Sequence, residues 1–263
     1  MTGPALPAGF QRRWTDIGGV RIHDVGTIDG SRPTVVLVPG IGLSHRVMLP
    51  IAELLAPHLA VRAPDPPGFG RSDKPRRPLG LPELADALAS WIEAAGLGRP
   101  ALVGNSFGCQ IIVELATRHP DLITCTVLQG PTMDAAARSL GRQTWRWLRD
   151  LVQERPDPRA RLCDYRDAGL RRVLATYRLA LRHRVEERLP RVTAPTLVVR
   201  GPDDPIVSQE WAETVAGLLP AGQLVVTDSG AHTLIDQLVE AALPFLQRHL
   251  PPVTWHTSGP VEG

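Results

Sequence analysis

The sequence predicts an α/β fold with a mainly parallel central sheet, helices on both faces and a small helical cap. Two observations support this. Short apolar runs alternate with segments of helical spacing along most of the 263 residues, as they do in strand–helix–strand crossovers. Between residues 131 and 190 the alternation stops and only helical spacing remains, which indicates an insertion. The predicted core is therefore 11–130 with 191–250, the cap is 131–190, and 251–263 is a flexible tail.

The first half of the predicted core holds a hairpin and three further strands. Gly18 and Gly19 separate two short runs and predict a β-hairpin of residues 13–17 and 20–25. Further strands are expected where apolar runs end in turn signals, and helices where apolar residues recur every three or four positions. In chain order these are a strand at 34–38, a helix around Met48–Leu55, a strand at 60–63, a helix at 81–95, a strand at 100–103 and a helix closed by His119–Pro120.

The second half continues the alternation on either side of the insertion. Strands are expected at 123–128, 196–200 and 224–227, with a final helix before the tail. The insertion contains two stretches of helical spacing. Their apolar positions are Trp145, Leu148, Leu151 and Val152 in the first, and Leu170, Val173, Leu174 and Tyr177 in the second.

Composition favours one globular domain without special partners. The chain is 43% hydrophobic and 21% charged, which is ordinary for a domain of this size. A net charge of +2 gives no general case for nucleic-acid binding. The sequence contains neither a run of about 18 apolar residues nor a signal-peptide pattern, so we expect a cytoplasmic protein with no membrane partner. Its three cysteines lack metal-ligand spacing, which predicts buried thiols and neither a disulfide framework nor a zinc site. We expect no metal and no cofactor.

The most informative motif is the pentapeptide Gly104–Gly108, which reads G-x-S-x-G directly after an apolar run. A serine at a tight strand-to-helix turn is the form of a nucleophile elbow. The apex residue, Ser106, then takes a strained backbone that exposes its hydroxyl. The glycines two positions away on either side remove Cβ atoms that would collide there.

A serine nucleophile needs a base, and the base needs a carboxylate to fix its tautomer. Among eight histidines, His232 stands in a turn after the strand at 224–227, at the sheet edge where ligands collect in open α/β folds. Asp203 and Asp204 follow the strand at 196–200, and one of them could instead form an Asx-type turn. Asp134, after the strand at 123–128, is a third candidate that ranks well below Asp204.

Two further segments add a resemblance to a known family. Residues 65–72, DPPGFGRS, resemble the D-x-P-G-x-G-x-S loop of the α/β-hydrolase fold superfamily, and residues 201–207, GPDDPIV, resemble its G-x-x-D-x-x-V acid loop. The chain thus resembles the serine-nucleophile branch of that superfamily over residues 14–249. The resemblance implies that Asp204 is the acid, and the order Ser106, Asp204, His232 is the order in that superfamily.

The oxyanion formed during acyl transfer requires backbone N–H donors. One is expected from Phe107, directly after the nucleophile. The resemblance to the family's H-G-x segment implies that Ile41 supplies the second, with Gly42 as the alternative donor. Pro39 occupies the usual histidine position, so the support of this loop must differ. Substrate contacts are expected from Gly40, Gly42, His45 and Trp145.

These expectations combine into a cofactor-free serine hydrolase that acts on a small to medium carboxylic ester or related acyl substrate. Ser106 argues against the related dehalogenases and epoxide hydrolases, which attack with aspartate. Pro39–Gly40 and Gly104–Ser106 resemble carbon–carbon hydrolases, whereas Thr233 departs from their aromatic residue after the histidine. That activity, an acyltransferase and a non-catalytic binding protein remain the alternatives. The cap holds 14 arginines against 8 acidic residues, either as a solvated face or to attract anionic substrates.

Overall fold

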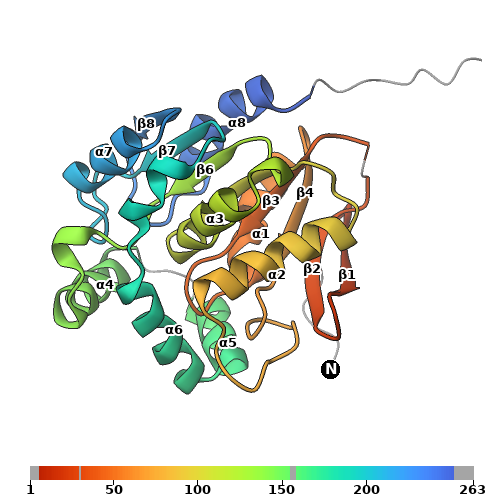
Figure 1. Cartoon of the computed structure of the whole chain (residues 1–263), viewed down its shortest axis with the longest axis horizontal. Helices are drawn as coiled ribbons and strands as arrows, with labels where there is room; N and C mark the ends of the chain where they lie inside the picture. The colour runs from red at the N-terminus through yellow and green to blue at the C-terminus, as the bar shows by residue number, and fades with distance from the viewer. Residues whose placement is uncertain (1–5, 30, 155–157, 252–263) are drawn as a thin grey trace, which may run out of the picture.

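The computed structural model describes residues 6–29, 31–154 and 158–251, and its centre is an eight-stranded sheet in the order β1-β2-β4-β3-β5-β6-β7-β8 (Figure 1). β1 and β2 form the predicted hairpin, and β2 pairs antiparallel with β4. From β4 to β8 all neighbours are parallel. The strands are β1 Phe10–Asp16, β2 Arg21–Thr27, β3 Thr34–Val38, β4 Ala60–Pro64, β5 Ala101–Asn105, β6 Thr126–Gln129, β7 Thr196–Arg200 and β8 Gly222–Val226.

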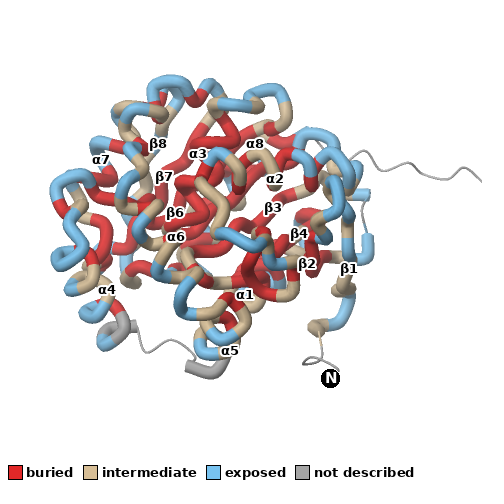
Figure 2. Tube along the Cα trace, turned by 60° about the horizontal axis from the view of Figure 1, so that its bottom comes forward, coloured by how far each residue is buried: buried red, intermediate tan, exposed pale blue. Residues whose placement is uncertain are grey.

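Helices cover both faces of this sheet because alternate strand residues face opposite sides. Val35 and Leu37 of β3 pack in one core with helices α1 and α8, and Val36 and Val38 pack in the other core with α2, α3 and α7. Figure 2 shows the sheet as the most deeply buried layer. The helices are α1 His45–Leu55, α2 Leu81–Ala94, α3 Phe107–Arg118, α7 Gln209–Leu218 and α8 Asp236–His249. The predicted α/β fold is confirmed.

The cap lies between β6 and β7, beyond the carboxyl ends of the strands (Figure 1). It contains three helices where the sequence predicted two: α4 Leu140–Glu154, α5 Pro158–Ala168 and α6 Leu170–Arg182. The additional helix, α5, was missed because its sequence is mostly polar and has no apolar periodicity. Short 3₁₀ turns flank the cap at Ala135–Ala137, Val185–Glu187 and Leu189–Arg191.

Differences at the ends of elements are small. β6 begins at Thr126 rather than at residue 123, because the 3₁₀ turn Pro120–Leu122 delays the chain's entry into the sheet. The predicted tail, 251–263, lies outside the described residues except for Pro251. Within the described residues, no helix is both long and apolar enough to cross a membrane.

All three cysteines are free thiols. Cys109 and Cys125 are buried as predicted, whereas Cys163 on α5 is partly exposed. Burial raises the pKa of the Cys125 thiol to about 12, so it remains protonated and unreactive at neutral pH.

Candidate active site

Ser106 stands between β5 and α3 in the conformation that the elbow motif predicts. Its φ of 54° makes it the one non-glycine residue with positive φ among those the structure describes. A Cβ on Gly104 would lie 2.7 Å from the Ile112 side chain, and one on Gly108 would lie 2.3 Å from the Val38 carbonyl oxygen. Both glycines are therefore needed for α3 to pack closely against the ends of β5 and β3. Phe107, the first residue of α3, has an N–H that the helix itself does not use.

His232 and Asp204 meet at the same edge of the sheet from two different loops. His232 Nδ1 lies 2.8 Å from Asp204 Oδ2, and both residues are buried. The other oxygen, Asp204 Oδ1, accepts the backbone N–H groups of Ile206 at 2.7 Å and Val207 at 3.0 Å. Burial by itself would raise the pKa of Asp204, but His232 and these N–H donors outweigh it and lower the pKa. The carboxylate therefore stays ionised beside the imidazole.

The other two acid candidates, Asp134 and Asp203, make different contacts. Asp134 caps a 3₁₀ turn by accepting the Ala136 N–H, and its other oxygen accepts Arg146 at 2.6 Å. Its carboxylate is thus engaged with the cap. The Asx-type bond considered for Asp203 is made by Asp204 itself, to Ile206 two residues on, while the Asp203 N–H bonds the Gly230 carbonyl.

The acid loop is held by Arg200, a residue that the sequence did not single out. This arginine is 7% exposed. Its guanidinium donates to the backbone carbonyls of Val207 at 2.8 Å, Pro202 at 3.2 Å and Asp204 at 3.3 Å. Three carbonyls of one loop thus converge on one rigid donor group, which fixes the loop that carries Asp204.

Gln129, at the end of β6, joins the serine turn to the histidine loop. Its carbonyl accepts the Ser106 N–H at 2.9 Å. Its side-chain oxygen accepts Asn105 Nδ2 at 2.8 Å, and its side-chain nitrogen donates to the backbone carbonyl of His232. Asn105 directly precedes the candidate nucleophile Ser106, so one buried glutamine connects the Ser106 turn to the loop of the candidate base. No local sequence pattern marks it, because its partners are distant along the chain.

The next residue, Gly130, lies directly against the imidazole. Its φ is +56°, and a Cβ there would be 2.8 Å from His232 Cε1, 2.9 Å from Nδ1 and 3.4 Å from Asp204 Oδ2. Only glycine leaves room for the ring in this position, and a positive φ independently favours it. Gln129 and Gly130 together place Ser106, His232 and Asp204 around one point of the backbone.

We expect Gly130→Ala to slow the reaction of Ser106 with a fluorophosphonate about 100-fold or more, since a displacement of about 1 Å has that effect on catalytic geometry. The methyl group must push His232 away, as the contact distances require. Gly217→Ala is the matched control: nothing lies within 4 Å of its Cβ position on α7. The control should keep its reactivity and gain about 0.5–1 kcal/mol of stability. Equal labelling rates in both variants would contradict this role for Gly130.

The predicted oxyanion loop lies beside the elbow and under the cap. A Cβ on Gly40 would be 3.0 Å from Asn105 Oδ1 and 3.6 Å from Ser106 Cβ. Gly42 has φ +74°, and its Cβ position is 2.7 Å from the Tyr165 ring of α5. Ile41 between them is half-buried. The predicted roles of Ile41 and Phe107 as donors fit this placement and stay predictions.

Helix α5 docks onto this loop through one carboxylate. Asp164 is fully buried and accepts the Ser44 N–H at 3.0 Å and the Ser44 hydroxyl at 2.6 Å. The Arg46 guanidinium bridges Asp164 and Asp167, the latter at 2.8 Å. Ser44 is also the N-cap of α1. The cap is therefore fixed to the segment that follows the oxyanion loop by polar contacts, which explains why α5 needs no apolar periodicity.

Trp145 and His45, two of the predicted substrate contacts, lie in different environments. Trp145 is 70% exposed on α4 and lines an open groove of about 410 Å³ that also includes Asp204, Pro205 and Arg149. His45 is buried at the start of α1, where its ring bonds Asp65. Direct contact of either residue with a substrate stays a prediction.

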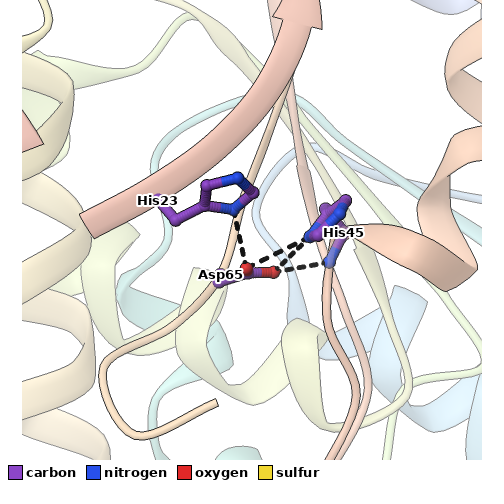
Figure 3. A group of neighbouring side chains, drawn as sticks. All are labelled: His23, His45 and Asp65. Carbon is purple, nitrogen blue, oxygen red and sulfur yellow. Dashed lines mark hydrogen bonds and ion pairs between the residues drawn. The ribbon is translucent and has the colours of Figure 1, made fainter. Parts of the chain in front are cut away.

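Asp65, from the loop resembling D-x-P-G-x-G-x-S, is the centre of a buried cluster with His23 and His45. Figure 3 shows both imidazoles directed at its carboxylate, each with Nδ1 at 2.9 Å. The backbone N–H groups of His45 and Arg71 donate to the same carboxylate at 2.7 and 2.9 Å. Two histidines and a carboxylate have the composition of a metal site. Here, however, the four N–H donors already occupy the carboxylate, so the cluster ties β2, β4 and α1 together.

The cluster predicts that the protein loses stability in acid. Burial would raise the pKa of Asp65, but the hydrogen bonds from His23 and His45 outweigh it and hold the pKa well below its usual range. A carboxyl whose folded pKa is depressed stabilises the fold above its unfolded pKa of about 4 and loses this contribution as the pH falls further. We expect the free energy of unfolding in urea to fall steeply below about pH 4. Asp65→Asn should lose about 3 kcal/mol at pH 7 and show a shallower acid limb. An unchanged acid limb in this variant would contradict the assignment.

Comparison with known proteins finds sequences that are similar to this chain. The sequence profile of a family described as "Alpha/beta hydrolase family" matches residues 35–242. A poly(3-hydroxyalkanoate) depolymerase of Ectopseudomonas oleovorans is 27% identical over 82% of this chain and 83% of its own length. A 2-(acetamidomethylene)succinate hydrolase of Mesorhizobium japonicum is 27% identical over 85% of this chain and 89% of its own length.

Solved structures show the same fold. A thermophilic esterase from Thermogutta terrifontis superposes with a TM-score of 0.72 at 22% identity, covering 91% of this chain and 99% of that chain. At this level of identity the likeness concerns the arrangement of the sheet and helices and not the substrate.

Proposed function

Because the chain belongs to the alpha/beta hydrolase family, we propose that it is a serine hydrolase that cleaves a small to medium carboxylic ester. Ser106 is the nucleophile, His232 the general base and Asp204 the orienting acid. The observation that carries the proposal is the 2.8 Å contact between His232 Nδ1 and Asp204 Oδ2. Gln129 and Gly130 link this pair to the strained turn at Ser106, whose φ is 54°.

The first half of the reaction forms an acyl-enzyme. Ser106 Oγ attacks the ester carbonyl carbon while His232 Nε2 takes the hydroxyl proton. The carbonyl oxygen becomes an oxyanion, which the N–H groups of Phe107 and Ile41 stabilise. As the tetrahedral intermediate collapses, the carbon–oxygen bond to the alcohol breaks and His232 returns the proton to the leaving oxygen.

The second half restores the enzyme. Water attacks the acyl carbonyl as His232 again takes a proton, and the Ser106 oxygen leaves with that proton while the carboxylic acid departs. Asp204 remains ionised throughout because its pKa is lowered by His232 and by two backbone donors against the effect of burial. Its negative charge stabilises the imidazolium without accepting the proton.

One of the relatives supports an ester substrate. It is named a depolymerase of poly(3-hydroxyalkanoate), a polymer whose repeating bond is an ester. A carbon–carbon hydrolase is the second candidate, favoured by the Pro39–Gly40 loop that packs against Asn105 and Ser106. It would use the same serine and histidine on a diketone acid.

The proposal is tested by covalent labelling followed by a substrate panel. A fluorophosphonate should label the wild-type protein once, and digestion with mass spectrometry should locate the adduct on Ser106. p-Nitrophenyl esters of graded acyl length then report the acyl preference, and a dienoate ring-fission product reports carbon–carbon cleavage. An adduct on any other residue would sink the Ser106 assignment, and turnover of the dienoate without any ester would favour the second candidate.

A further inference from the structure

The cap exposes apolar side chains to an unusual degree. Of the eleven large apolar side chains that are exposed among the described residues, seven belong to its three helices, although the cap is less than a quarter of the chain. Scattered exposed apolar residues are ordinary, but a concentration of them marks an interaction surface. The seven are Leu140, Trp145, Leu148 and Val152 of α4, Leu162 of α5, and Leu170 and Leu174 of α6.

Helix α4 faces outward with its apolar side. Trp145, Leu148 and Val152 are 70%, 46% and 79% exposed, and their spacing of three and four residues places them along one side of the helix. At 3.6 residues per turn the opposite side carries Gln143 and Asp150, and each of these is only 2% exposed. Gln143, Asp150 and the half-buried Trp147 thus face inward, and the stripe of Trp145, Leu148 and Val152 faces outward, although a helix that covers a core buries its apolar stripe.

The acidic and basic side chains of the cap also differ in exposure. The described carboxylates of the cap either pair with arginines or are buried. Asp134 pairs with Arg146, and Glu186 pairs with Arg138. Several arginines remain exposed and form no hydrogen bond or ion pair with any residue that the structure describes. These are Arg149 of α4 and Arg171, Arg178 and Arg182 of α6. The exposed side chains of the cap helices therefore include both these apolar residues and these arginines.

We propose that the outer surface of the cap binds an anionic lipid bilayer. An amphipathic helix with tryptophan and leucine on one side and arginine beside them lies in the headgroup region of such a membrane. The arginines would contact lipid phosphates while the α4 stripe enters the acyl boundary. Figure 1 shows the cap helices at the end of the molecule opposite α8. Bilayer binding would therefore hold the Ser106 side of the sheet towards the lipid.

Charge favours a bilayer over the other occupants of this surface. A second copy of the chain would bring two arginine-rich surfaces together, which like-charge repulsion opposes. Nucleic acid would pair with the arginines but would leave the apolar stripe in contact with phosphates and water. The proposal does not depend on the reaction catalysed. It also differs from the expectation of no membrane partner, which rested on the lack of a spanning segment and a signal peptide.

The test is co-sedimentation of the full-length protein with vesicles of phosphatidylcholine alone and with about 30% phosphatidylglycerol. We expect binding to the anionic vesicles and little to the neutral ones, and a strong reduction when sodium chloride is raised to about 0.5 M. The tryptophan emission should shift to shorter wavelength on binding, and Trp145→Phe should remove the shift. No binding to anionic vesicles at low salt, or equal binding to both kinds, overturns the proposal.

Substitutions then locate the contact. The double variant Leu148→Ser/Val152→Ser should lower the partition coefficient at least about tenfold. Its matched control is Ile28→Ser/Leu54→Ser, which removes two exposed apolar side chains outside the cap and should bind like the wild type. Both pairs are exposed, so neither should unfold the protein. Equal effects of the two double variants overturn the proposal, as does a dimer in sedimentation equilibrium that only the cap variant dissociates.

The charge contribution has its own pair of variants. Arg178→Gln should weaken binding to the anionic vesicles about fivefold, the equivalent of about 1 kcal/mol for one arginine at an anionic surface. Arg248→Gln on α8 also removes an exposed arginine and should have no effect. A loss that is the same for both would mean that only the net charge matters, which contradicts a defined binding face.

Discussion

Ser106→Ala is expected to lower kcat on the best ester of the panel on the order of 10⁶-fold. Loss of a serine nucleophile has this effect in a triad enzyme because the remaining groups act only through it. The backbone at this position has φ 54°, and alanine meets the same strain as serine, so the variant should fold like the wild type. Steady-state kinetics with thermal unfolding as a folding check would measure both.

A matched control separates the loss of this hydroxyl from a general effect of serine removal. Ser90 lies on the exposed side of α2, and Ser90→Ala should keep full activity. If Ser106→Ala retained more than about one-hundredth of the wild-type rate, the proposed acyl-enzyme route would be wrong.

Asp204→Asn is expected to lower kcat about 10⁴-fold with little change in the fold. The structure gives a specific reason. Oδ1 accepts two backbone N–H groups, from Ile206 and Val207, so an asparagine must keep its oxygen there and turn its NH₂ group towards His232. That group would donate to Nδ1 and force the proton of the imidazole onto Nε2. The histidine could then no longer accept the proton of Ser106.

Asp134→Asn is the comparison that distinguishes the two acid candidates. Its carboxylate bonds Arg146 and the Ala136 N–H, so the substitution should cost about 1 kcal/mol of stability and leave kcat near the wild-type value. The two variants, Asp204→Asn and Asp134→Asn, are compared by their kcat values and by their unfolding midpoints. A mild Asp204→Asn together with an inactive Asp134→Asn would overturn the assignment of the acid.

Much of the fold could be predicted because its signals are local. The strands that follow one another through the parallel sheet are short apolar runs with turn residues at their ends, as at 34–38 and 196–200. Such patterns depend on near neighbours along the chain. Helix α5 could not be predicted in this way, because it is held by Asp164 through contacts with Ser44, which is 120 residues away in the sequence.

The residues of the candidate site fall into the same two groups, those marked by a local sequence pattern and those that are not. Ser106 is marked by glycines two residues away, and His232 and Asp204 by their positions after strands. Gln129, Gly130 and Arg200 carry no such mark, although they contact or hold all three segments. The exposure of Trp145 was likewise invisible to helical spacing, which shows that a side of a helix is apolar but not which way that side faces.

The sequence by itself thus determined the α/β fold, the strained serine turn and the short set of residues able to complete its chemistry, because each follows from spacing over a few residues. Only the tertiary structure decided that Asp204 faces His232 while Asp134 bonds the cap, that Gly130 makes room for the imidazole, and that the apolar side of α4 faces outward. Those facts are contacts between segments far apart in the chain, and they exist only once the sheet brings the ends of its strands together.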